Sequence, residues 1–221
     1  VALVTVTTQY PQGSEKQQIF SVTGRRVPPG GLPMDVGCVV ENVGTALAVR
    51  EAVVEGRPLL FRSITVSGDA VKSPANLIAP IGAGFDCLVD ACGGVLGTPA
   101  RIVSGGPMMG FALPELDVAM TKTSSGLLLF QAGSLVQYRA QPCISCGRCV
   151  DACPMRLMPS ELSQAIEADD IDMAEQYNVM DCFECGTCAY VCPATRPLVQ
   201  HMRRAKAVIV QRRRAQAAKK S

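Results

Sequence analysis

Eight of the eleven cysteines fall in two runs of identical spacing, and this pattern constrains the fold more than any other feature. Each run ends in a Cys-Pro pair, Cys153-Pro154 in the first and Cys192-Pro193 in the second. A disulfide scaffold is usually a shorter chain with its cysteines spread through loops. The two runs therefore predict metal ligation in a reducing compartment.

The spacing within each run is typical of iron–sulfur cubanes. Two residues between successive thiolates let one tight turn place the sulfurs on neighbouring irons, and in two-cluster ferredoxins the fourth cysteine of each run binds the other cluster. We therefore predict two [4Fe–4S] clusters with crossed ligands. The first set is Cys143, Cys146, Cys149 and Cys192, and the second set is Cys153, Cys182, Cys185 and Cys188.

The alternative metal is zinc, held in two structural Cys₄ sites. Such sites are built from two C-x-x-C pairs, whereas each run here is a triplet followed by a prolyl-flanked fourth cysteine. Gly147 and Gly186, after the second cysteine of each run, let the backbone approach a cluster. Free N–H groups there would bond the sulfides and adjust the reduction potential.

Two predicted helices separate the runs. Ser160 can cap a helix over 161–168, and Asp170 can cap one over 171–177. A third helix is expected to begin at Pro197 and to continue into a basic tail. Because a compact bacterial ferredoxin joins its halves with strands, these helices favour an α-helical ferredoxin domain.

The first 140 residues predict a different architecture. A helix is expected over 43–54, a β-hairpin over 59–81 turning at Ser67-Gly68-Asp69, a helix over 85–92, and strands over 101–104 and 127–130. This order indicates a small β-grasp domain, so the fold class is α+β. Residues 4–7 alternate like a strand, and we interpret the start as a piece cut from a longer chain. The first ten residues are not expected to form a signal peptide, and no transmembrane helix is expected, because no apolar run is long enough to span a bilayer.

Charge is unevenly distributed along the chain. The formal net charge is +2, but the segment from Leu198 to Ser221 contains eight Lys/Arg and no Asp/Glu. This tail would dock on anionic lipid or an acidic partner, or remain a solvated extension. Nucleic acid is not expected, because no aromatic residue interleaves with the arginines. Cys38, Cys87 and Cys92 are expected to be buried apolar thiols, and His201 a solvated residue.

The sequence around both runs resembles the C subunit of the Rnf electron-transport complex, an ion-translocating ferredoxin:NAD oxidoreductase. The resemblance covers 142–162, 181–188 and 192–194, and it extends to 23–25, 67–71 and 104–110. It implies four segments: 1–55 as the end of a flavin/NADH-binding domain, 56–138 as a β-grasp domain called SLBB, 139–205 as the α-helical two-[4Fe–4S] ferredoxin domain, and 206–221 as the basic tail.

The resemblance also implies a function, cofactors and partners. The Rnf C subunit passes electrons between NADH/FMN and ferredoxin in a complex that couples this flow to ion movement. Partners would be another iron–sulfur subunit, integral membrane subunits and NADH, at the cytoplasmic side of the bacterial inner membrane. Glu15, Asn42 and Thr45 match segments near the nucleotide and flavin. The glycine-rich flavin/NADH loop is absent from this sequence, so FMN is expected in the full-length chain and not in this fragment. The alternative is a soluble iron–sulfur flavoprotein of the cobalamin-reductase or heterodisulfide-reductase type.

Overall fold

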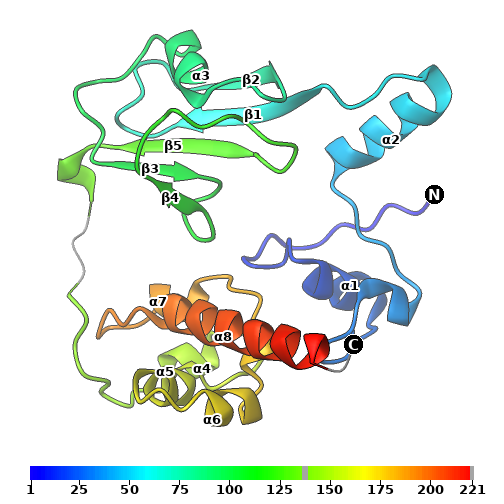
Figure 1. The fold of residues 1–221 in the computed structure, drawn as a ribbon. Coiled ribbons are helices and arrows are strands. Elements are labelled where there is room, and N and C mark those ends of the chain that lie inside the picture. The colour runs from blue at the N-terminus through cyan, green and yellow to red at the C-terminus, as the bar shows by residue number, and fades with distance from the viewer. Residues whose placement is uncertain (136–138, 220–221) are drawn as a thin grey trace. The chain divides into compact units, whose positions relative to one another are not determined.

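The computed structural model describes residues 1–135 and 139–219, which form two compact units. One unit is Glu41–Gln137, and the other combines Val1–Val40 with Tyr138–Ser221. Figure 1 shows the elements of each unit. The N-terminal segment therefore belongs with the cysteine-rich part of the chain, although some hundred residues separate them in the sequence.

The middle unit contains a five-stranded mixed sheet of order β2-β1-β5-β3-β4. The strands are β1 (Phe61–Ser67), β2 (Ala75–Pro80), β3 (Arg101–Ser104), β4 (Phe111–Leu113) and β5 (Gly126–Phe130). β1 and β5 pair in parallel, and the other neighbouring pairs are antiparallel. This sheet, with α3 (Phe85–Ala91), confirms the predicted α+β class and the hairpin over 59–81. The short strand β4 was not predicted.

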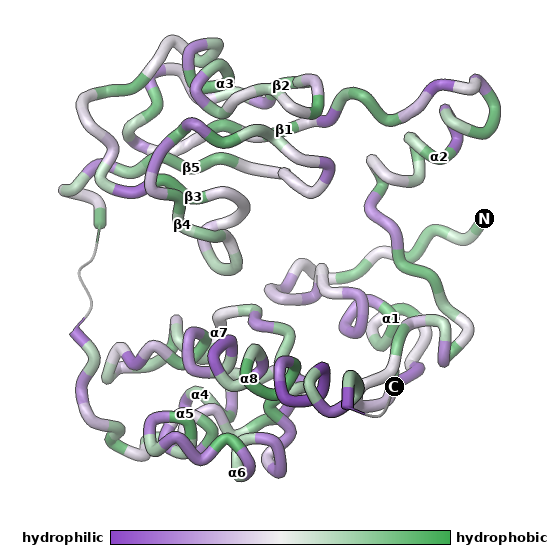
Figure 2. Tube along the Cα trace, in the orientation of Figure 1, coloured by the Kyte–Doolittle hydropathy of each residue, from purple (hydrophilic) through white to green (hydrophobic). Residues whose placement is uncertain are grey.

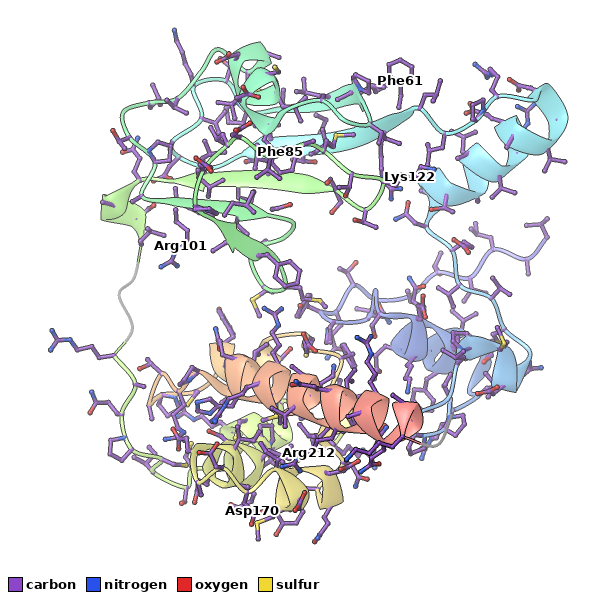
Figure 3. The ribbon with its side chains drawn as sticks, viewed as in Figure 1. Phe61, Phe85, Arg101, Lys122, Asp170 and Arg212 are labelled. Atoms are coloured by element: carbon purple, nitrogen blue, oxygen red, sulfur yellow. The ribbon has the colours of Figure 1, made fainter. Side chains whose placement is uncertain are left out.

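Alternating side chains of the sheet and one face of α3 form the core of this unit. Val66, Leu127 and Leu129 are fully buried, and Phe85 begins α3 against them (Figure 3). The turn after β1 needs glycine, because Gly68 has a φ of 114° and a Cβ there would lie 2.0 Å from the Leu129 carbonyl oxygen.

Helix α2 (Val43–Glu55) forms as predicted but has no buried residue. Apolar side chains on it, such as Val43 and Val53, are exposed, and Figure 2 shows green segments along the helix. Asn42 begins the helix by accepting a hydrogen bond from the Gly44 backbone N–H at 2.9 Å. The sheet unit also contains a 3₁₀ turn, η2 (Ala132–Ser134).

The other unit is helical. It contains the elements α1 (Glu15–Thr23), η1 (Pro33–Val36), α4 (Arg148–Asp151), α5 (Pro159–Glu167), α6 (Ile171–Gln176), η3 (Val179–Asp181), α7 (Thr187–Tyr190) and α8 (Leu198–Ala218). Leu162, Ile166, Met202 and Ile209 are almost fully buried and pack α5 against α8. The predicted α-helical domain is thus present. The strand-like alternation at 4–7 was misleading, since these residues form no strand.

The N-caps of α5 and α6 were predicted from single residues, and one of the two predictions holds. Asp170 caps α6 as predicted, accepting from the Met173 backbone N–H at 2.9 Å. The prediction for Ser160 was wrong, because α5 begins earlier, with Met158 at the cap position and Pro159 as the first helical residue. Proline is favoured there because its fixed φ suits a helix and its missing N–H would be unpaired anyway.

The basic segment continues α8 to Ala218 without a break, so the proposed boundary at 205/206 falls inside one helix. Its arginines pair with acidic residues of the same unit: Arg204 with Asp169, Arg212 with Asp172 and Arg213 with Glu175. Figure 3 labels Arg212 on α8. None of the helices described here, α8 included, is long and apolar enough to cross a membrane.

Candidate metal centre

The two cysteine runs fold into the same backbone shape twice. Three pairs of equivalent residues have left-handed backbones: Ser145 and Glu184, Gly147 and Gly186, and Arg156 and Thr195. The glycines directly precede α4 and α7, which carry the third cysteine of each run, Cys149 and Cys188. Each run therefore bends sharply between its cysteines, and the third cysteine of each run is buried.

Each run contributes one cysteine to a cavity lined by the other run. One cavity, of about 580 Å³ including its open mouth, is lined by the set Cys143, Cys146, Cys149 and Cys192. A second, of about 400 Å³, is lined by the set Cys153, Cys182, Cys185 and Cys188. We call these the first and second cavities. The grouping equals the two ligand sets predicted from the spacing, while ligation itself stays a prediction.

The arrangement of the sulfurs bears on which metal fits. Within residues 1–135 and 139–219, no three His, Cys, Asp or Glu side chains converge to hold a single metal ion. The cysteines instead surround open space. Four thiolates around a cavity are a donor set that fits a [4Fe–4S] cluster.

Backbone N–H groups point at several of the sulfurs. Ser145 donates to Cys143 Sγ and Glu184 donates to Cys182 Sγ, each at 3.4 Å. Leu157 donates to Cys153 Sγ, also at 3.4 Å. Such donors stabilise the negative charge of thiolates. The bonds expected from N–H groups near Gly147 and Gly186 to the sulfides of a cluster stay a prediction.

Burial raises the pKa of three of the eight thiols, those of Cys149, Cys182 and Cys188. Burial, with added repulsion from Cys182, Cys185 and Cys153, raises the pKa of Cys188 to about 12. Burial likewise raises the pKa of Cys149, with a smaller contribution from Cys192. Cys153 and Cys192 each belong to the opposite run, which again shows the crossed grouping. Binding of a metal must displace these protons, since the thiolate is the ligand.

The cavities differ in what surrounds the sulfurs. Polar residues Ser160, Glu161 and Arg196 line the first cavity, whereas apolar residues such as Phe183 and Met202 line the second. The exception in the second cavity is Glu184, which pairs with two cations of α8.

Those cations are Arg203, whose Nε lies 2.8 Å from the carboxylate, and Lys206, whose Nζ also donates to the Cys182 carbonyl at 2.9 Å. Burial alone would raise the pKa of Glu184, but hydrogen bonds from Lys206 and Arg203 outweigh it and lower that pKa. The pair of contacts fixes the second run to α8.

The N-terminal segment contacts the residues around the second cavity. The Tyr10 hydroxyl donates to the Cys185 carbonyl. The Gln17 amide donates to the Pro154 carbonyl at 3.4 Å, and the Gly30 N–H donates to Asp181 Oδ1 at 3.3 Å. Sequence reasoning missed these contacts, because no local pattern links a single tyrosine to a loop so far along the chain.

The residues proposed near flavin and nucleotide are not brought to one place within a unit. Glu15 is exposed in the first turn of α1, in the cysteine-rich unit. Asn42 and Thr45 lie at the start of α2, in the other unit. The Asn42 side chain already serves as a helix cap. Their roles stay predictions.

The predictions for the three other cysteines and for His201 hold only in part. Cys92 is buried as expected, Cys38 is partly exposed, and the expectation for Cys87 was wrong because its thiol is exposed. The prediction of a solvated His201 was also wrong. Its ring is only 17% exposed, and Nδ1 lies 2.8 Å from Ser163 Oγ.

Three family models match the chain in this order. The Nuo51 FMN-binding domain matches residues 1–51, the SLBB domain matches 63–112, and the 4Fe-4S dicluster domain matches 135–193. The last match spans both cysteine runs and ends just past Cys192. The family models thus agree with the fold of both units and with a two-cluster module.

Curated proteins similar to the chain share one type of name. The chain is 50% identical over 163 residues to the C subunit of a proton-translocating ferredoxin:NAD(+) oxidoreductase complex from Clostridium ljungdahlii, covering 74% of this chain and 36% of that protein. It is 44% identical over 207 residues to the C subunit of the Na(+)-translocating ferredoxin:NAD(+) oxidoreductase complex of Acetobacterium woodii, covering 94% of this chain and 47% of that protein. It is 45% identical over 212 residues to the C subunit of the ion-translocating oxidoreductase complex of Pseudomonas aeruginosa, covering 96% of this chain and 27% of that protein. The chain thus spans less than half the length of these relatives.

Proposed function

We propose a function from the premise that the chain belongs to the family of the C subunits of ion-translocating ferredoxin:NAD⁺ oxidoreductase (Rnf) complexes. Over these residues it acts as a relay for electrons between NADH/FMN and ferredoxin, through two [4Fe–4S] clusters. The observation that carries the proposal is the pair of cavities, each lined by three cysteines of one run and one of the other. Ion translocation would belong to the whole complex.

The chain's own residues would bind and insulate the clusters. When bound, such a cluster takes up and gives back one electron at a time. The eight thiolates hold the irons, with Cys143, Cys146, Cys149 and Cys192 at the first cavity and Cys153, Cys182, Cys185 and Cys188 at the second. The N–H groups of Ser145 and Glu184 bond their sulfurs. Because each run lends its fourth cysteine to the other cavity, the clusters are held close together, which suits transfer between them.

Further parts of the proposal concern the whole protein. The match of residues 1–51 to an FMN-binding domain supports a flavin upstream of the clusters, with Glu15, Asn42 and Thr45 near it. The partners would be another iron–sulfur subunit and integral membrane subunits. The chain would lie peripherally at the cytoplasmic side of the bacterial inner membrane. The names of the relatives favour this assembly over a soluble flavoprotein carrier.

Metal analysis of anaerobically purified protein tests the proposal. We expect about eight irons and eight acid-labile sulfides per chain, and two interacting signals in low-temperature EPR of the reduced protein. Cys188→Ala should remove one signal, and Cys38→Ala, a thiol outside both cavities, should leave both. Zinc without sulfide would refute the relay. Recovery with integral membrane subunits would support the complex, whereas a solely soluble carrier would appear in the cytosolic fraction.

A further inference from the structure

Arg196 is a buried cation at the wall of the first cavity. Its residue is 8% exposed, and it lines the cavity together with Cys192. One guanidinium nitrogen, Nη2, donates to Ser163 Oγ at 2.8 Å and pairs with Glu167. The Nε atom is buried and has no hydrogen-bond partner among the described residues. A buried donor left unpaired costs free energy, so an acceptor is expected at this place.

The equivalent position at the second cavity is apolar. Leu157 follows Cys153 at the same distance along the chain as Arg196 follows Cys192, and Leu157 lines the second cavity as Arg196 lines the first. The backbone around the two positions repeats, with left-handed Arg156 and Thr195 just before them. The fold therefore accepts leucine at this position, and the arginine is not required by the shape of the turn.

The charges near the second cavity do not reproduce this arrangement. Lys206 and Arg203 lie beside that cavity but do not line it, and both pair with the half-buried Glu184. At the first cavity, Glu167 is the partner of Arg196, but its side chain is 46% exposed and therefore better screened by water. Net charge alone does not favour the first side, because Glu161 also lines the first cavity and two cations share one carboxylate beside the second. Among the described residues, however, only the first cavity has a cation in its lining.

We propose that Arg196, through its free Nε donor and its buried charge, raises the reduction potential of the cluster in the first cavity. This inference rests on the proposed function. Reduction adds one negative charge to a cluster, and a nearby cation and N–H donor stabilise that charge.

Redox titration followed by EPR on the anaerobically purified 221-residue chain tests the proposal. The signals are first assigned with Cys143→Ser, which should perturb the first-cavity signal. The substitution Arg196→Leu gives the first cavity the residue type that Leu157 provides at the equivalent position of the second cavity. Because hydrogen bonds to charged groups are strong, we expect the reduced-to-oxidised ratio of the first cluster at a fixed potential to fall about tenfold or more, and tenfold is about 59 mV for a one-electron couple. The second cluster should not shift.

Two further variants separate tuning from structural support. Arg196→Lys keeps the charge and loses the Nε donor, so it should give a smaller shift in the same direction. Glu167→Gln removes the counter-charge and should move the first cluster the opposite way. Arg204→Leu, which breaks an exposed pair with Asp169 away from both cavities, is the matched control.

The outcomes are distinguishable. Opposite shifts of the first cluster in Arg196→Leu and Glu167→Gln support the proposal. Unchanged potentials in iron-loaded variants, or equal shifts of both clusters, overturn it while leaving the relay intact. If Arg196→Leu does not retain iron, Arg196→Lys and Glu167→Gln decide by the same criteria. A wild-type chain without iron and sulfide would instead remove the proposed function itself.

Discussion

The substitution Ile209→Ala, which shortens a buried side chain of α8, tests whether the basic end of the chain is part of the cluster-bearing unit. Ile209 is 1% exposed and packs in one core with Leu162, Ile166 and Ala174 of α5 and α6. Replacing it with alanine removes buried apolar carbons and leaves a cavity, which costs about 2–5 kcal/mol for isoleucine. Since Ile209 lies near the middle of α8, we expect about 3 kcal/mol.

The loss of the visible absorbance of the clusters to an iron chelator reports on this unit alone. If iron is released from transiently opened molecules, a loss of about 3 kcal/mol in the stability of this unit raises the release rate roughly 100-fold. Each 1.4 kcal/mol changes the population of opened molecules by a factor of about ten. Val210→Ala is the matched control, since Val210 is next in sequence but not part of that core. Equal release rates for Ile209→Ala and Val210→Ala would refute the docking of α8.

Three other perturbations have defined outcomes. Gly68→Ala should unfold the sheet unit, measured as lost strand signal in circular dichroism, because its Cβ would meet the Leu129 carbonyl; near-wild-type stability would contradict that contact. Tyr10→Phe should cost about 1 kcal/mol of local stability by losing the hydrogen bond to the Cys185 carbonyl, seen as faster amide exchange in the N-terminal segment and not in the sheet unit. Burial, aided by nearby arginines, lowers the pKa of His201 below its ordinary 6.5. The unfolded chain therefore binds the extra proton first, so thermal stability should fall as pH drops below about 6.5, and His201→Gln should weaken that pH dependence.

The cysteine grouping was predictable because it depends on spacing alone. In each run, two residues separate the first three cysteines, and three residues precede the fourth. This spacing predicts that the first three sulfurs face one cavity and the fourth faces the other, and the two cavities are lined by these two sets. The hairpin and α6 were predictable for a similar reason, since Gly68 and Asp170 act on their own neighbours.

Contacts between distant segments could not be derived in this way. The hydrogen bond from Tyr10 to Cys185 depends on how residues 1–40 pack on the cysteine-rich part, and no local periodicity encodes it. His201 looked like part of a charged helix face, but its side of α8 packs toward Ser163 on α5. Arg196 looked equally ordinary, because only the folded turn shows that its Nε is buried beside cysteines.

The crossed ligation of two clusters is the central claim, and serine variants of single cysteines test it most directly. We expect Cys192→Ser to perturb the same EPR signal as Cys143→Ser, although Cys192 belongs to the second run. Cys153→Ser should perturb the signal that Cys182→Ser perturbs. If Cys192→Ser instead perturbed the signal altered by Cys182→Ser, each run would hold its own cluster and the account would be wrong.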